Sequence, residues 1–257
     1  MPSLARLGLV VWLLLPVSAG ADPVRMRQPE CSAHGFLVLE DASGTVRAHG
    51  ELTQWVERGA IASRLVFHFD DGSLYDELVR FSQRPVFRVL SYRLVQRGGS
   101  FKDSSDIQFD RSGKYRASIQ KASDEEPETA AGTMEIPEDV SNGIVSILLK
   151  NLAPGASATT HLLAFRPEPI LLELELRPEG SDEFWVGSSA GKATRFVVTP
   201  RVVGIKGVFA TATGKQPQAF RMWIAQGRAP VLLRFEGPLY MDGPPWRIEH
   251  GAPRWQR

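Results

Sequence analysis

Cysteine and histidine are scarce in this chain. Its 257 residues include one cysteine, Cys31, and five histidines. A single cysteine cannot form a disulfide within the chain, so stability has to come from a hydrophobic core. No two histidines have the spacing of a zinc site. We therefore expect no structural metal, and we expect Cys31 to be a buried or idle thiol.

The chain also lacks an excess of charge of either sign. Its 30 Lys and Arg residues nearly balance its 29 Asp and Glu residues, and they form no basic run. This balance argues against a nucleic-acid partner and against electrostatic attachment to a membrane surface. Phosphate-binding glycine loops, calcium loops and dinucleotide fingerprints are missing as well, so no cofactor is predicted.

Long apolar runs are absent except at the N-terminus. There, Arg6 precedes an apolar run from Leu7 to Val17, and Ala19 and Ala21 follow it. The run is shorter than the roughly 20 residues that span a bilayer, and the pattern is typical of a secretory signal peptide cleaved after Ala21. We expect a periplasmic or secreted protein of 236 residues, the full 257 less the first 21, with no transmembrane segment.

Strand patterns dominate the mature chain. The segments "ASRLVFHF" and "SLYDELVRFSQ" alternate around "DDG", which predicts a hairpin. A three-residue loop would pair Phe67 with Tyr75 and Ile61 with Phe81, and would place Glu77 on the apolar face. A two-residue loop would pair Phe67 with Asp76 and is less favourable.

Further short strands follow, separated by Pro and Gly, and the acidic segment 123–132 is predicted to be a solvated loop. The pattern predicts a mainly β protein: an open barrel or a strongly curved antiparallel sheet. We assign 22–34 as an N-terminal extension and 35–257 as a single β-rich domain.

One amphipathic helix is predicted among these strands, at about 137–152. Pro137 suits its first turn, and Gly143 would cost about 1 kcal/mol relative to Ala in mid-helix unless a strand approaches closely there. The apolar stripe recurs at four-residue steps: Val140, Ile144, Leu148 and Leu152. We expect the helix to pack on the concave side of the sheet.

Two motifs invite a catalytic interpretation. The sequence "GSSAG" around Ser189 matches a nucleophile elbow, but β-type residues rather than a helix follow it, so a surface hairpin is favoured. Glu173 and Glu175 share one face of a strand and are better explained as its solvent face, with Leu172, Leu174 and Leu176 inward.

Asp76 and Glu77 point to opposite faces of one strand, so one of them has to lie on the more apolar side. A salt bridge from this pair to a nearby strand arginine, such as Arg88 or Arg93, is favoured over catalysis. His68, on the preceding strand, is expected to be structural or solvated.

Four stretches together resemble a family of uncharacterised exported bacterial β-rich proteins, a domain of unknown function: "FHFDDGSLYDELVRFSQRPVFRVLSYRLVQRGGSF", "PEDVSNGIVSILLKN", "GKQPQAFRMWI" and "EGPLYMDGPPWRIE". The resemblance implies a curved sheet around a helix, loosely similar to periplasmic lipoprotein carriers and lipocalin-like folds. It supplies no catalytic residue.

With no catalytic signature, we expect a non-enzymatic protein that binds an apolar or amphipathic ligand such as a lipid. That hypothesis requires a largely apolar pocket of at least ~300 Å³. An envelope protein–protein interaction module is the first alternative, and a hydrolase using Asp76, Glu77 and His68, or Ser189, is the second. The candidate ligand-binding residues are Asp76, Glu77, Phe81, Gln83, Trp223, Tyr240 and Trp246.

Overall fold

Strands make up most of the structure. The computed structural model describes residues 23–203, 217–225, 227–250 and 254–255; the predicted signal peptide and the predicted cleavage site after Ala21 lie outside them. Its strands are β1 (Ala33–Glu40), β2 (Val46–Glu57), β3 (Ala60–Phe69), β4 (Leu74–Ser82), β5 (Arg88–Arg97), β6 (Asp103–Asp110), β7 (Lys114–Lys121), β8 (Glu128–Thr133), β9 (Ala158–Phe165), β10 (Pro169–Val186), β11 (Ser189–Val202), β12 (Phe220–Ala225), β13 (Val231–Pro238), β14 (Pro245–His250) and β15 (Arg254–Trp255). The helix α1 (Val145–Asn151) lies between β8 and β9 in the chain.

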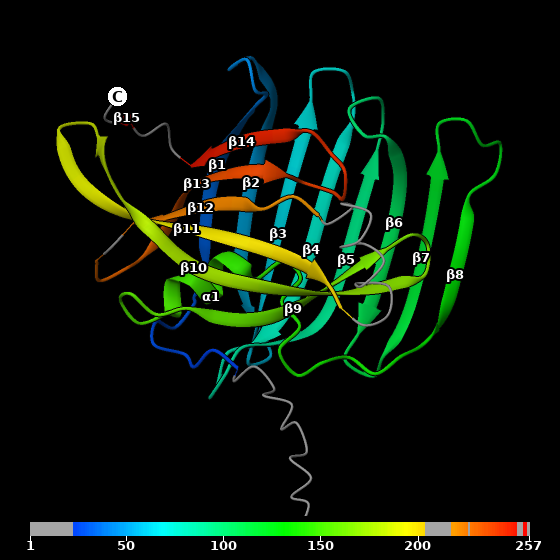
Figure 1. The fold of residues 1–257 in the computed structure, drawn as a ribbon, viewed down its shortest axis with the longest axis horizontal. Coiled ribbons are helices and arrows are strands. Elements are labelled where there is room, and N and C mark those ends of the chain that lie inside the picture. Colours follow the sequence, from blue (N-terminus) through cyan, green and yellow to red (C-terminus); the bar gives the residue numbers. More distant parts are fainter. Residues whose placement is uncertain (1–22, 204–216, 226, 251–253, 256–257) are drawn as a thin grey trace, which may run out of the picture.

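All these strands belong to one antiparallel sheet (Figure 1). Its order is β15-β10-β11-β12-β13-β14-β1-β2-β3-β4-β5-β6-β7-β8, and β9 also pairs with β10. Among the described residues the sheet does not close, because β8 and β9 each pair on one side only. The expected mainly β fold with a strongly curved antiparallel sheet is confirmed.

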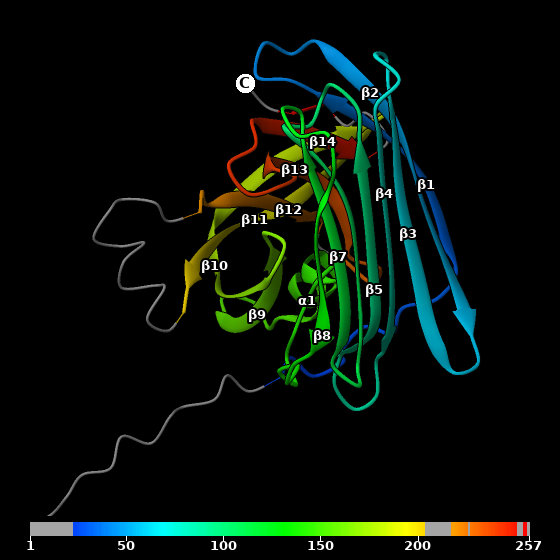
Figure 2. The same ribbon diagram turned by 90° about the vertical axis from the view of Figure 1, so that its right-hand side faces the viewer.

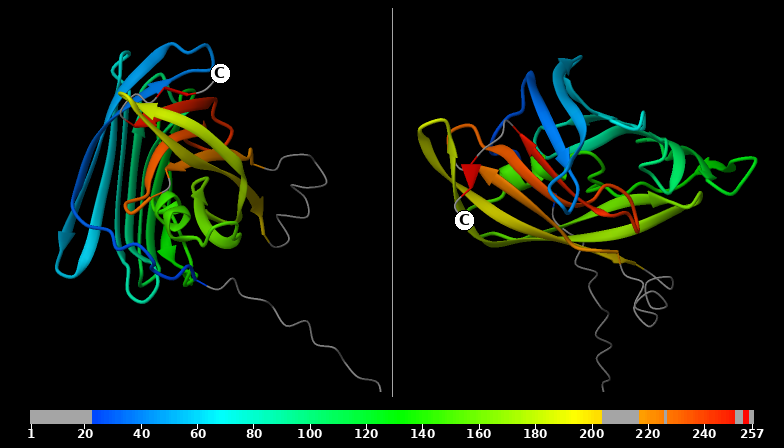
Figure 3. Two further views of the ribbon diagram at one scale, coloured as in Figure 1. Left: turned by 90° about the vertical axis from the view of Figure 1, so that its left-hand side faces the viewer. Right: turned by 90° about the horizontal axis from the view of Figure 1, so that it is seen from above.

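The sheet curls so that its two halves face each other. Figures 2 and 3 show β1–β8 as one wall and β9–β14 folded over it, with α1 in between. One core cluster joins Leu148 of α1 to Val79 of β4 and to Leu174 and Val198 of the opposite half. The helix therefore lies on the concave side, as expected, and ties the two halves together.

The β3–β4 hairpin has the predicted register. Phe67 pairs with Tyr75 and Ile61 with Phe81. The alternation places Phe67, Tyr75 and Phe81 in the core, each at most 4 % exposed. Glu77 consequently lies on the concave face with them, two residues from Tyr75 along β4.

The helix is shorter than predicted. It begins at Val145 rather than at Pro137, and it is seven residues long. Gly143 has a φ of +73°, a left-handed conformation that no α-helix continues through. The predicted close approach of a strand at Gly143 is confirmed, since an added Cβ there would lie 2.9 Å from Cβ of Val79. No helix in the described part of the chain is long and apolar enough to cross a membrane.

Polar groups of the turn that precedes α1 form hydrogen bonds with β9. The Asn142 side-chain amide donates to the carbonyl of Leu163 at 2.8 Å, and its oxygen accepts the Leu163 N–H at 2.9 Å. The Ser141 N–H and hydroxyl both donate to the carbonyl of His161. These bonds satisfy backbone groups along β9, which is an edge strand.

The acidic segment 123–132 is only partly the loop that was predicted. Residues 128–133 form β8, which pairs with β7 along its length. Its side chains are nearly all exposed. Because neither face of β8 is buried, the segment carries no apolar alternation, and its composition is that of a loop.

The N-terminal segment is anchored to the end of α1. The Lys150 ammonium lies 2.6 Å from the Glu30 carboxylate, and both side chains are at most 15 % exposed. The Gln54 amide donates to the other carboxylate oxygen of Glu30 at 3.0 Å. The Asn151 carboxamide oxygen accepts the N–H groups of residues 27 and 28. Next to Glu30, Cys31 is exposed, so it is not the buried thiol that was one of two expectations.

Candidate functional site

A cavity of about 450 Å³ lies inside the curved sheet. The wall formed by β4 to β7 lines one side, and β9 and β10 line the other. The turn before α1 and the loop between β13 and β14 also contribute, as do Lys102, Glu128, Pro200, Pro217, Gln218 and Phe220. The lining is mainly apolar and aromatic. The helix therefore fills only part of the space inside the curl. The predicted requirement of at least ~300 Å³ of largely apolar cavity is met.

Two rows of side chains cross the β4–β7 wall of the cavity. One row consists of Tyr75, Gln96, Ser105 and Ile119, and the next consists of Glu77, Leu94, Ile107 and Ala117. Each row runs across four neighbouring strands because directly paired residues share one face of the sheet. Polar groups are thus set at fixed points in an otherwise apolar wall.

Glu77 is the acidic group of this wall. The Tyr92 hydroxyl donates to its carboxylate at 2.8 Å, and Tyr75 lies two residues away on the same face of β4. Burial raises the pKa of Glu77, and the interactions with Tyr92 and Tyr75 only partly oppose that effect. Burial, with the adjacent Glu77 carboxylate, raises the pKa of each tyrosine far above its usual range. Both tyrosines therefore keep their protons, and Tyr92 acts as a donor.

Gln96 is the second polar group of the wall. Its side chain is 5 % exposed, and its carboxamide oxygen accepts the Ser105 hydroxyl at 3.2 Å. Its amide nitrogen is buried and has no hydrogen-bond partner among the described residues. Exchanging the nitrogen and oxygen positions would leave the oxygen unpaired instead. Such a group costs roughly 1–3 kcal/mol.

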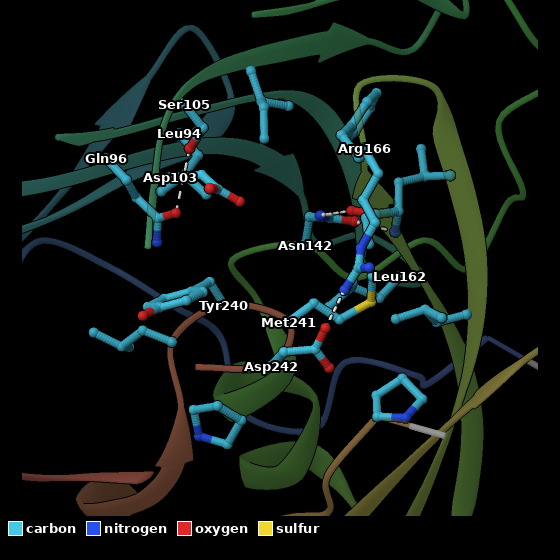
Figure 4. Close-up of a pocket in the computed structure, with 18 of the residues that line it drawn as sticks. Leu94, Gln96, Asp103, Ser105, Asn142, Leu162, Arg166, Tyr240, Met241 and Asp242 are labelled. Atoms are coloured by element: carbon cyan, nitrogen blue, oxygen red, sulfur yellow. Dashed lines mark hydrogen bonds and ion pairs between the residues drawn. The ribbon is translucent and has the colours of Figure 1, made fainter. Parts of the chain in front are cut away.

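Charged side chains surround the mouth of the cavity (Figure 4). Arg166, in the turn after β9, pairs with Asp242 in the β13–β14 loop. On β7, Lys121 pairs with Glu128 of β8. The first pair links the β9–β10 turn to the β13–β14 loop, and the second links two neighbouring strands. Each contributes little to stability, because exposed ion pairs are typically worth under about 1 kcal/mol.

Of the seven candidate ligand-binding residues, two line the cavity: Glu77 and Tyr240. Tyr240 lies in the β13–β14 loop, where its ring is 5.8 Å from that of Phe101. Asp76 lies on the outer face of β4 and forms a bidentate ion pair with Arg64, with contacts of 2.9 and 2.7 Å. The expected salt bridge to a nearby strand arginine therefore exists, and the arginine is Arg64 of β3 rather than either of the two examples, Arg88 and Arg93.

The other four candidates lie in the core or the scaffold. Phe81 is fully buried, and Trp246 lies in a second core cluster under β1, β2 and β14. Trp223 donates from its indole to Asp182 at 2.6 Å. Gln83 exchanges two hydrogen bonds with the backbone of Glu30 and so holds the N-terminal segment. None of these four lines the cavity.

The residues considered for hydrolysis do not converge. Glu77 faces the cavity, whereas Asp76 and the exposed His68 lie on the opposite face of the sheet. Ser189 pairs directly with Val186 across a two-residue turn and opens strand β11. It is therefore part of a surface hairpin, as favoured, and no nucleophile elbow forms there. Glu173 lies on the outward face of β10, opposite the inward leucines.

Sequence reasoning missed Gln96, Ser105 and Arg166 as cavity residues. Gln96 lies in a long strand with apolar residues on both faces, so the sequence pattern does not show which face of the strand points into the sheet's interior. The register of β5 against β4 supplies that direction: Gln96 pairs with Tyr75.

Comparisons of the chain with protein-family models, with curated proteins and with solved structures find no match. Within the part of the chain that the structure describes, no three His, Cys, Asp or Glu side chains converge on a point that would hold a metal ion. The cavity and the polar groups set into its apolar wall are therefore the basis for assigning a function.

Proposed function

We propose that this protein is a non-enzymatic binder of an apolar or amphipathic ligand, such as a lipid, in the cavity between the two halves of the sheet. The observation that supports this best is the cavity itself: about 450 Å³ remain beside α1 and are lined mainly by apolar and aromatic side chains. Binding sites for small molecules usually have volumes of ~300–1,000 Å³ and this kind of lining. Export to the periplasm or the medium is part of the proposal.

The lining is arranged as an amphipathic ligand requires. Leu94 and Ile107 pair directly across β5 and β6 in the middle of the wall, and both line the cavity. Exposed charged residues lie at the mouth and Glu77 lies within the wall, so a polar group of a ligand can meet charge while its chain meets apolar side chains. Transfer of an apolar chain out of water contributes about 0.8 kcal/mol for each methylene buried.

Binding of N-phenylnaphthylamine tests the proposal. This uncharged dye becomes fluorescent in apolar surroundings. Leu94→Trp extends a larger side chain from the middle of the wall into the cavity and should weaken dye binding at least tenfold. Gln108→Trp is the matched control, because Gln108 is exposed on the outer face of the adjacent strand β6. Equal dye binding by both variants, or no dye binding by the wild type, would refute the proposal.

The free edge of β8 favours a second candidate, an envelope interaction module. Within the described residues β8 pairs only with β7, and its outer edge is open to a strand from a partner protein. A photo-crosslinking residue at the exposed Thr129 would then give a discrete adduct in cells. The same residue at Glu51, in the centre of the sheet, would not. Identical adduct patterns at the two positions would exclude this role for β8.

A further inference from the structure

The Glu77 carboxylate has no cationic partner within the part of the chain that the structure describes. It forms no ion pair there, and the Tyr92 hydroxyl donates a hydrogen bond to it. It is nevertheless held in an apolar wall, directly across from Leu94. Buried carboxylates in proteins are normally paired with a cation or fully hydrogen-bonded. Glu77 is therefore poised for a partner that the described residues do not supply.

Tyr92 leaves most of the carboxylate available. An ionised carboxylate has about four acceptor positions, and the Tyr92 hydroxyl occupies one of them. Both neighbouring tyrosines are packed tightly: Tyr92 stacks on Phe109 with ring centroids 5.3 Å apart, and Tyr75 meets Phe67 edge to face. The Tyr92 hydroxyl thus holds the carboxylate in place. The remaining acceptor capacity belongs to a group that already lines the cavity.

The cations at the mouth do not compensate this charge. Arg166 and Lys121 already form ion pairs with acids at the mouth. Lys102 is exposed to solvent, where its charge is screened within about 10 Å at ordinary salt. The charged side chains that line the cavity comprise three cations and four acids once Glu77 is included. An anionic group entering the cavity would approach an uncompensated carboxylate.

We propose that the ligand of this cavity is an amphiphile whose polar end is a hydrogen-bond donor, an ammonium or a hydroxyl group, and that this end binds the Glu77 carboxylate. The inference rests on the proposed function, because it names the chemistry of the ligand for the same cavity. It excludes amphiphiles with a carboxylate or phosphate end. A hydrogen bond to a charged group is roughly twice as strong as one between neutral groups, so the ammonium form should bind most tightly.

Calorimetric titration with dodecylamine, dodecanol and dodecanoate at neutral pH separates these end groups on one alkyl chain. The wild type should bind dodecylamine most tightly and dodecanoate at least tenfold more weakly. Glu77→Gln keeps the size of the side chain but removes its charge. It should weaken dodecylamine binding by about 10- to 100-fold, the range for hydrogen bonds to charged groups. Dodecanol binding should change only a few-fold, because a carboxamide oxygen still accepts a hydrogen bond from the hydroxyl group.

Glu183→Gln is the matched control, because Glu183 is exposed near the tip of the β10–β11 hairpin and does not line the cavity. It should bind all three probes as the wild type does. If the wild type and Glu77→Gln bind dodecylamine and dodecanoate equally well, the end-group inference fails while the proposed function stands. If none of the three probes binds, and N-phenylnaphthylamine does not bind either, the proposed function fails as well.

Discussion

Replacing Gly143 with Ala adds one methyl group at the point where the turn before α1 meets β4. The new Cβ would lie 2.9 Å from both Cβ and Cγ1 of Val79. Val79 is 2 % exposed and belongs to the main core cluster, so it has little room to move. The φ of +73° at Gly143 also places Ala in the left-handed region.

Two costs therefore add. The left-handed conformation costs a residue with a Cβ about 1–2 kcal/mol, and overpacking of a tight core costs about 1–3 kcal/mol. We expect Gly143→Ala to lower the free energy of unfolding by about 2–5 kcal/mol. Gly155→Ala separates the two terms. Gly155 has a φ of +75° but nothing within 4 Å of an added Cβ, so only the backbone term of about 1–2 kcal/mol applies.

Urea unfolding of the mature protein, followed by tryptophan fluorescence, measures both variants. The midpoint should fall for each, and further for Gly143→Ala, with an unchanged slope. A continuous helix over 137–152 leads to the opposite sign, because Gly→Ala in a helix interior stabilises by about 1 kcal/mol. A more stable Gly143→Ala protein would therefore refute the assignment of a left-handed turn packed against β4.

Three further outcomes are expected. Lys150→Met leaves the Glu30 carboxylate nearly buried and without its cation, and should lower the free energy of unfolding by about 3 kcal/mol. A double variant that also carries Glu30→Gln should recover part of that loss. Strictly additive losses from the two substitutions would contradict the pairing. Burial raises the pKa of Glu77, so the folded protein holds this proton more tightly than the unfolded chain, and stability is lost as pH rises from the ordinary carboxyl pKa through the folded value. Glu77→Gln lacks that loss, so its stability relative to the wild type should rise between pH 4 and pH 7 in parallel urea titrations; a pH-independent difference would show that Glu77 titrates normally. The double variant Gln96→Leu, Ser105→Ala removes the unpaired buried amide nitrogen of Gln96 and the hydroxyl that bonds to the Gln96 oxygen. It should raise the free energy of unfolding by about 1 kcal/mol. A decrease of more than 1 kcal/mol would mean that the Gln96 amide has a partner in the folded protein.

The hairpin register shows how much of the fold the sequence predicts. The alternation in "ASRLVFHF" and the "DDG" turn predict the pairing of Phe67 with Tyr75, and from it the inward direction of Glu77. Local pattern is sufficient here because one face of each strand is buried and a slip by one residue would expose it.

The same reasoning fails where long-range packing decides. The stripe Val140, Ile144, Leu148 predicts a helix from residue 137, and all three residues are indeed buried, but only the last lies in α1. Gly143 and the hydrogen bonds of Asn142 to β9 favour a turn over the first half of the stripe. Gly143 packs against Val79 of β4, and Asn142 bonds to Leu163 of β9. Both contacts join residues that are distant in the sequence, so no local sequence pattern contains them.

The sequence predicts that there is space inside the sheet, but it does not predict which residues line that space. An exported β-rich chain with one amphipathic helix favours a curved sheet with space inside, and Glu77 and Tyr240 were among the candidates. Phe81, Gln83, Trp223 and Trp246 were not separable from cavity residues by sequence, because aromatic and amide side chains occur in cores, scaffolds and cavity walls alike. Only the three-dimensional pairing of strands distinguishes these roles.

The central claim is that the space beside α1 holds a ligand. Native mass spectrometry of the mature protein, purified from the producing cells without detergent, tests it most directly. Our account predicts a reproducible added mass that solvent extraction releases as an amphiphile with an amine or hydroxyl end, and that Leu94→Trp protein lacks. A single mass equal to the bare chain, with no uptake of N-phenylnaphthylamine by the same preparation, would contradict it.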